Sequence, residues 1–189
     1  MIETLLIILS AVFFLLLVTG GWVFGGYNVL VKGRQNIKTM FSNMKTEYQR
    51  RADLFYNLAE AVKSYAKFEK DTLTQVIAMR NGNFGSNNKE AMKKMKGLDG
   101  FLSKLMVVVE RYPKLRATEE YKELMKETRI TEDRINIART NFNDVVREYN
   151  IFVVSFPSNF LAGMFNFKEE DYFENEEGTN QAPKMDLKI

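Results

Sequence analysis

The residues that could do chemistry in this chain are carboxylates, amides and basic side chains, because the sequence contains no histidine and no cysteine. Without histidine, the chain lacks the commonest general base and the usual pH switch. Nucleophilic systems that pair serine or cysteine with histidine are excluded, as are helix-bundle di-metal sites that use histidine. We therefore predict no catalytic residue, no cofactor and no metal site, and we expect a protein that is not an enzyme.

Nine polar residues stand beside apolar helical stripes and are the candidates for a specific role. They are Arg51, Asp53, Asn57, Glu69, Glu110, Glu132, Arg139, Asn143 and Asn150. Glu132 and Arg139 are seven residues apart, so they share one face of a helix. Such residues could line a ligand pocket between helices. We favour the other interpretation, in which they form salt bridges and amide hydrogen bonds that set the register of a bundle.

A long helix over residues 118–156 must position Glu132 and Arg139. Its seam alternates steps of three and four through Tyr121, Leu124, Thr128, Thr131, Ile135, Ala138, Phe142, Val145, Tyr149, Phe152 and Phe156. This heptad spacing predicts a narrow stripe that packs against other helices. Thr118 is the expected N-cap. Pro157 is expected to end the helix, because proline lacks the backbone N–H and disfavours a helical residue before it.

An earlier helix is predicted from apolar residues with helical spacing between Leu30 and Ile77. No proline or glycine interrupts the chain after Gly33, so we expect the helix to continue to about Arg80. Whether it kinks between residues 50 and 58 is left open.

A shorter helix is expected after residues 81–88, a loop rich in glycine and asparagine. Gly97 and Gly100 weaken this helix by about 1 kcal/mol each relative to alanine, and Pro113 ends it. An apolar cluster at residues 160–167 predicts one more short helix. The fold class is therefore all-α, with a transmembrane helix followed by an antiparallel up-and-down bundle of three long helices and a short C-terminal one.

The N-terminal segment is a predicted membrane anchor, because no charged residue occurs from Thr4 to Val31 and roughly 20 apolar residues cross a bilayer. A cleaved signal peptide fits less well, since Glu3 is the only charged side chain before the apolar run. Basic residues follow the run at Lys32 and Arg34. Positive charge stays cytoplasmic, so we expect a single-pass protein of the inner membrane with its N-terminus outside and its bundle in the cytoplasm.

Gly21 and Gly25 form a G-x-x-x-G pattern, which lets two membrane helices approach closely. They are a possible contact between two membrane helices. The alternative is that they only make the helix more flexible where it leaves the membrane. The expected domains are an anchor at 1–26, a bundle at 27–173 and an acidic, flexible tail at 174–189. The net charge of +3 and the absence of aromatic residues interleaved with basic ones argue against a nucleic-acid partner.

Several motifs, spread over nearly the whole chain, resemble the LemA family. They are Tyr27–Val31, Arg51–Leu58, Tyr65–Ala66 with Glu69, Glu110–Leu115, Glu132–Pro157 and Pro183–Leu187. The family pattern has a proline where this chain has Tyr56, which makes the helix count less certain. The motif residues expected to serve structure or interaction are Asp53, Asn57, Glu110, Tyr112, Pro113, Glu132, Arg139, Asn143, Tyr149, Asn150, Phe156 and Pro157.

The resemblance implies an N-terminally anchored four-helix bundle with no enzymatic activity to carry over. A branch of the family belongs to magnetosome membranes, which suggests a scaffold. One end of the long helix pair would keep an apolar stripe that either the C-terminal helix or another copy covers. We thus predict a membrane-anchored scaffold that forms a homo-oligomer and contacts the lipid bilayer and other membrane proteins. The alternative is a sensor or adaptor that binds a small ligand or envelope peptide between helices.

Overall fold

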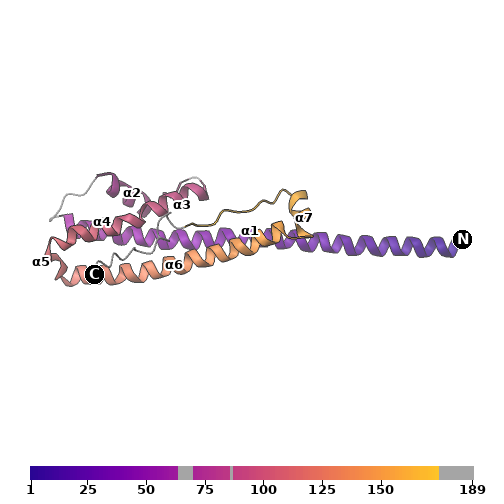
Figure 1. The fold of residues 1–189 in the computed structure, drawn as a ribbon, viewed down its shortest axis with the longest axis horizontal. Helices are drawn as coiled ribbons and strands as arrows, with labels where there is room; N and C mark the ends of the chain where they lie inside the picture. Colours follow the sequence, from indigo (N-terminus) through magenta and orange to yellow (C-terminus); the bar gives the residue numbers. More distant parts are fainter. Residues whose placement is uncertain (64–69, 86, 175–189) are drawn as a thin grey trace, which may run out of the picture. The chain divides into compact units, whose positions relative to one another are not determined.

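The computed structural model describes residues 1–63, 70–85 and 87–174, and these contain helices and no strand. The helices are α1 (Ile2–Lys63), α2 (Lys70–Arg80), α3 (Asn88–Gly97), α4 (Asp99–Glu110), α5 (Pro113–Arg116), α6 (Glu119–Val154) and α7 (Ser158–Met164) (Figure 1). The all-α prediction is confirmed. Outside the described residues lie Tyr65, Ala66, Glu69, the motif Pro183–Leu187 and nearly all of the expected tail.

The chain divides into two compact units. The first, called the anchor unit below, comprises residues 1–39 and 143–172. The second, called the helical body, comprises residues 40–142 and 173–189. Helices α1 and α6 contribute residues to both units, and each unit is described by itself.

In the helical body, α2 turns back along α1, so the expectation of one helix to about Arg80 is wrong. The Arg80 guanidinium lies 3.2 Å from the Asp53 carboxylate and 4.3 Å from the centroid of the Tyr56 ring. In one straight helix Asp53 and Arg80 would be about 40 Å apart at 1.5 Å per residue. In contrast, α1 is unbroken through Tyr56, where the family pattern has proline. The α3–α4 pair and then α6 reverse direction in turn, so each of these segments runs antiparallel to the one before it (Figure 1).

The helix expected between residue 88 and Pro113 is divided in two. Gly97 is the last residue of α3, Leu98 is its C-cap, and Asp99 opens α4. The break falls between the two glycines that weaken the helix, so their position explains it. A short helix, α5, then begins at Pro113, where the sequence suggested only an end.

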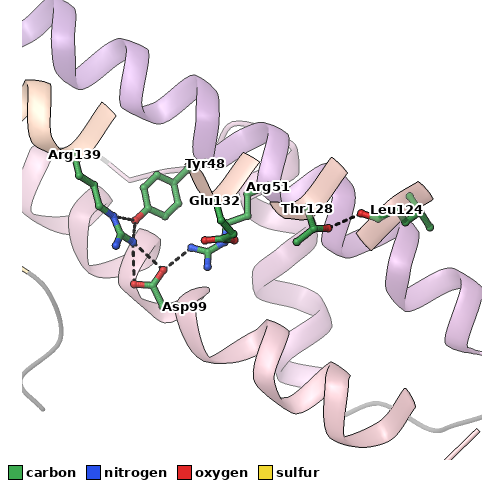
Figure 2. A network of polar contacts seen from close by, with 7 residues as sticks. All are labelled: Tyr48, Arg51, Asp99, Leu124, Thr128, Glu132 and Arg139. Carbon is green, nitrogen blue, oxygen red and sulfur yellow. Dashed lines mark hydrogen bonds and ion pairs between the residues drawn. The ribbon is translucent and has the colours of Figure 1, made fainter. Parts of the chain in front are cut away.

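Helix α6 begins and ends as predicted. The Tyr121 backbone N–H donates to the Thr118 hydroxyl at 3.3 Å, so Thr118 is the N-cap. The helix ends at Val154, three residues before Pro157. Thr128, buried in the seam, satisfies its hydroxyl by donating to the Leu124 carbonyl at 2.7 Å (Figure 2).

The core of the helical body forms where α6 meets α1 and where α1 meets α4. Phe142 packs on Phe41 with ring centroids 5.5 Å apart, and Phe55 packs on Phe101 at 5.1 Å. The seam predicted for α6 is buried here at Tyr121, Thr128, Thr131, Ile135 and Phe142.

In the anchor unit the seam leaves its predicted register. The buried residues are Val146, Tyr149 and Val153, whereas Val145 and Phe152 are only half-buried. Phe156, expected in the core, is 80% exposed and lies beyond the end of α6. A straight helix drifts about 20° per heptad relative to a strict seven-residue repeat, so the buried stripe moves by one residue after a few heptads.

The C-terminal segment covers the α1–α6 pair of the anchor unit. The Asn150 side-chain amide donates to the Glu170 carbonyl at 2.9 Å and accepts from the Glu170 N–H at 2.9 Å. Arg34 lies 3.6 Å from the Glu170 carboxylate, and Gly33 leaves room for the Tyr149 ring. The segment after α7, around Glu170, therefore covers this part of the α1–α6 pair.

Helix α1 carries the predicted membrane span. It is long and apolar enough to cross a bilayer, and none of its most apolar window is buried. The side chains from Leu5 to Val18 therefore have no core in which to bury, as expected for a segment that faces lipid.

Candidate functional site

The most concentrated group of charges in the helical body is an ion-pair network between α1, α4 and α6 (Figure 2). Arg139 donates to the Asp99 carboxylate at 2.9 and 3.0 Å, and its Nε donates to the Tyr48 hydroxyl at 2.8 Å. Arg51 pairs with the same Asp99 carboxylate. On its other side, Arg51 Nε lies 2.8 Å from Glu132 Oε1. This last N–H is not aligned for a hydrogen bond, so the contact is electrostatic.

Three helices bring these side chains together. Tyr48 and Arg51 are three residues apart on α1 and therefore share a face, as do Glu132 and Arg139 on α6. Asp99 comes from the first turn of α4, where the helix dipole favours a carboxylate. The network thus joins three helices through one acid at a helix start.

Burial makes the network costly to disrupt. The Arg51 side chain is only 4% exposed and stacks on two rings, with its guanidinium carbon 5.1 Å from the centroid of Phe55 and 5.6 Å from that of Tyr48. Phe173 closes another side, 5.0 Å from the Arg139 guanidinium carbon. Two arginines face two carboxylates, so the charges balance within the group.

The pKa values of Tyr48 and Glu132 are both raised in the network. Burial, together with the nearby Asp99 carboxylate, raises the pKa of Tyr48 to about 12. Burial also raises the pKa of Glu132, although Arg51 opposes the shift. Among the described residues, no group of three or more His, Cys, Asp or Glu side chains could hold a metal ion. This arrangement can hold three helices in one register.

The raised pKa of Glu132 predicts a pH dependence of stability. The folded protein binds the Glu132 proton more tightly than the unfolded chain does, so the protonated carboxyl stabilises the fold. This stabilisation is complete below the ordinary pKa of 4.5 and is lost as pH rises through the raised pKa of the folded state. We expect the melting temperature of the wild type to fall relative to that of Glu132→Gln as pH rises through this window. Circular dichroism at 222 nm measures both proteins, and a constant difference would contradict the assignment.

Other predicted site residues of the helical body lie away from this network. Asp53 pairs with Arg80 at the surface, and Asn57 is exposed. Glu110 is the exposed last residue of α4, and Tyr112 and Pro113 open α5. These positions shape helix ends and the surface, and the structure does not gather them into one site.

In the anchor unit, Tyr149 and Asn150 are buried and hold the C-terminal segment, Asn143 is half-buried, and Phe156 and Pro157 follow the end of α6. A side chain added at Gly21 or Gly25 would meet nothing within 4 Å. The two glycines face open space, so their membrane-helix contact stays a prediction.

The sequence pattern singled out Arg51, Glu132 and Arg139 but missed Asp99 and the polar role of Tyr48. Asp99 lies between two glycines, where helical periodicity fails. The sequence feature that could have identified Asp99 is its position between Gly97 and Gly100, where a new helix can start. Tyr48 looked like an ordinary core residue, because its ring does belong to the core.

A second feature of the helical body is an open groove of about 320 Å³ between α1 and α6. It is lined by Met40, Asn43, Glu47, Arg134, Ile137, Ala138 and Asn141. Ile137 is 61% exposed, and Ile130, seven residues earlier on the same face, is also exposed. Glu47 Oε2 is buried and has no hydrogen-bond partner among the described residues.

Comparison with known proteins assigns this architecture to a family. A model of the LemA family matches residues 40–187, which is well over half of the chain. The chain belongs to the LemA family. The match includes all five residues of the buried network, and it confirms the resemblance seen in the sequence motifs.

Curated relatives include two kinds of LemA-like protein. Magnetosome protein MamQ 2 of Paramagnetospirillum magneticum is 31% identical over 175 residues, and magnetosome protein MamQ of Magnetospirillum gryphiswaldense is 29% identical over 174 residues; each match covers 78% of this chain. Protein LemA of Metamycoplasma hominis is 23% identical over 140 residues, or 73% of the chain. The chain spans 64% of the length of each relative, so it is similar to part of them.

Proposed function

We propose that this LemA-family protein is a membrane-anchored scaffold that works by interaction rather than catalysis and self-associates through the groove between α1 and α6. The apolar N-terminal helix supports the anchor. Similarity to magnetosome proteins supports a role at a membrane-bounded structure. The basic residues that follow the apolar run favour a cytoplasmic body and an N-terminus on the outer side of the inner membrane.

The groove is the observation that carries this proposal. Ile130 and Ile137 repeat at the heptad interval, which suits contact with another helix. Their exposure leaves apolar surface in water that an interface would bury. The charged residues of the network, by comparison, face one another.

The charges in the groove favour a second copy as the occupant. Glu47 lines it from α1 and Arg134 lines it from α6. In a twofold dimer each surface meets itself, so Glu47 of one copy can approach Arg134 of the other twice. Such a contact would place a guanidinium beside each Glu47 carboxylate that lines the groove.

The Glu47 carboxylate that lines the groove favours a second candidate function, a sensor or adaptor. A cationic small molecule or a basic envelope peptide could enter the groove and pair with this carboxylate. The two candidates differ in whether the protein without added ligand is an oligomer.

Replacing Ile137 with aspartate tests self-association. We expect Ile137→Asp to weaken the oligomer about 100-fold, because a carboxylate would be buried in an apolar contact. Asn136→Asp is the matched control, since Asn136 is exposed on the same helix about 100° away and gains the same charge. Light scattering of the full chain in detergent measures the mass of each protein.

A wild type that stays monomeric in detergent and in vesicles would contradict self-association. A monomer whose melting temperature rises with a lysine-rich peptide would instead favour the sensor. Equal dissociation by both aspartate variants would place the interface elsewhere.

A further inference from the structure

Helix α7 exposes a face made only of large apolar side chains. Phe156 is 80% exposed, Phe160 64% and Met164 69%. Phe160 and Met164 are four residues apart on α7, so they lie on one face of the helix, and Phe156 precedes it in the turn after α6. The rings of Phe156 and Phe160 meet edge to face at 6.0 Å. Soluble surfaces seldom carry such an apolar cluster without a partner.

The opposite face of α7 fixes the helix on α1. Leu161 and Ala162 are buried, and a Cβ added at Gly26 would lie 2.3 Å from Leu161 Cδ1. Gly26 therefore leaves room for the Leu161 side chain, which would have to move if a larger residue stood there. The Tyr27 ring packs edge to face on Phe165 at 4.8 Å and on Phe167 at 5.9 Å.

This docking point coincides with the end of the predicted membrane span. The uncharged run extends from Thr4 to Val31, and roughly 20 of its residues cross the hydrocarbon core. Gly26 and Tyr27 therefore lie near the boundary with water, where tryptophan and tyrosine are enriched. Trp22 and Tyr27 are both exposed here.

The segment that carries α7 has no charge to oppose contact with lipid. No charged residue occurs from Tyr149 to Phe167. This uncharged segment belongs to the same anchor unit as the uncharged run of α1.

We propose that α7 lies in the membrane interface and inserts Phe156, Phe160 and Met164 among the lipid chains, as a second membrane contact beside the span. Amphipathic helices bind this boundary by burying an apolar face a few ångströms below the headgroups. The inference rests on the proposed anchoring by α1. It adds a surface that would hold the anchor unit against the bilayer.

Fluorescent labels on single cysteines test the inference, because the chain has no cysteine of its own. Phe160→Cys reports α7, Phe13→Cys reports the span, and Val107→Cys is an exposed apolar control in the helical body. Each full-length protein is labelled with bimane in vesicles of phosphatidylethanolamine and phosphatidylglycerol. Brominated lipid chains and aqueous iodide then serve as quenchers.

We expect brominated lipid to quench the labels at residues 160 and 13 but not at 107, and iodide to quench residue 160 several-fold less than 107. A residue-160 label that behaves like residue 107 would overturn the inference. So would protection from both quenchers, which would mean that protein covers α7. Loss of lipid quenching at residue 13 would overturn the anchor as well, and quenching at 13 without 160 would overturn only the α7 contact. Melting curves of the labelled proteins verify that each is folded.

Discussion

Replacing Arg51 with methionine is expected to lower the free energy of unfolding by about 3 kcal/mol, because it leaves Glu132 without its partner inside the protein. Methionine keeps the packing of the Arg51 stem against Phe55 and Tyr48, so the loss reports mainly the charge. For a chain of this length, the melting temperature should fall by about 10 °C. Circular dichroism at 222 nm of the full chain in detergent measures this change.

Arg50→Met is the matched control for Arg51→Met. Arg50 neighbours Arg51 in the chain and pairs with Glu127 at 3.0 Å, but this pair is substantially exposed. Exposed pairs contribute about 0–1 kcal/mol, so the control should be nearly neutral. Equal effects of the two substitutions would show that the buried network adds no more stability than a surface pair.

Adding Glu132→Gln to Arg51→Met identifies the cause of the loss. Glutamine removes the charge that has lost its partner, so the double variant should be more stable than Arg51→Met alone. If it is not, the destabilisation comes from the rings or from Asp99 rather than from Glu132.

The other large effect is expected from Phe142→Ala, which should cost about 3–5 kcal/mol through lost burial and the cavity left beside Phe41. Phe142 is fully buried in the helical body, whereas Phe156 is exposed, although both belong to the same predicted heptad seam. Phe156→Ala is therefore the control and should change the free energy of unfolding by less than about 0.5 kcal/mol. Thermal unfolding of the two variants in detergent compares them, and similar losses would contradict the register observed in α6.

The sequence predicted the helices well wherever side-chain periodicity and end signals agree. Thr118 and Pro157 bracket α6 correctly, and the apolar run marks the membrane helix. Periodicity also placed Glu132 and Arg139 on one face of the helix, so the sequence alone grouped two members of the network. These features are local, and local spacing is what a sequence records directly.

The features that sequence reasoning missed depend on contacts between distant residues. The reversal that brings Arg80 beside Asp53 has no proline or glycine between residues 64 and 79 to mark it. Asp99 joined the network only because α4 starts where the two helices that carry the arginines come close. The shift from Val145 to Val146 reflects the mismatch between 3.6 residues per turn and a seven-residue repeat, which accumulates too slowly for a pattern to show.

The charge-balanced group around Arg51, whose side chain is only 4% exposed, differs from the surface ion pairs of the helical body in its response to salt. Mobile ions screen exposed pairs such as Arg50 with Glu127 within about 10 Å at moderate ionic strength, but they reach buried pairs far less. The Arg51 pairs that join α1, α4 and α6 should therefore depend less on ionic strength than the Arg50–Glu127 pair does.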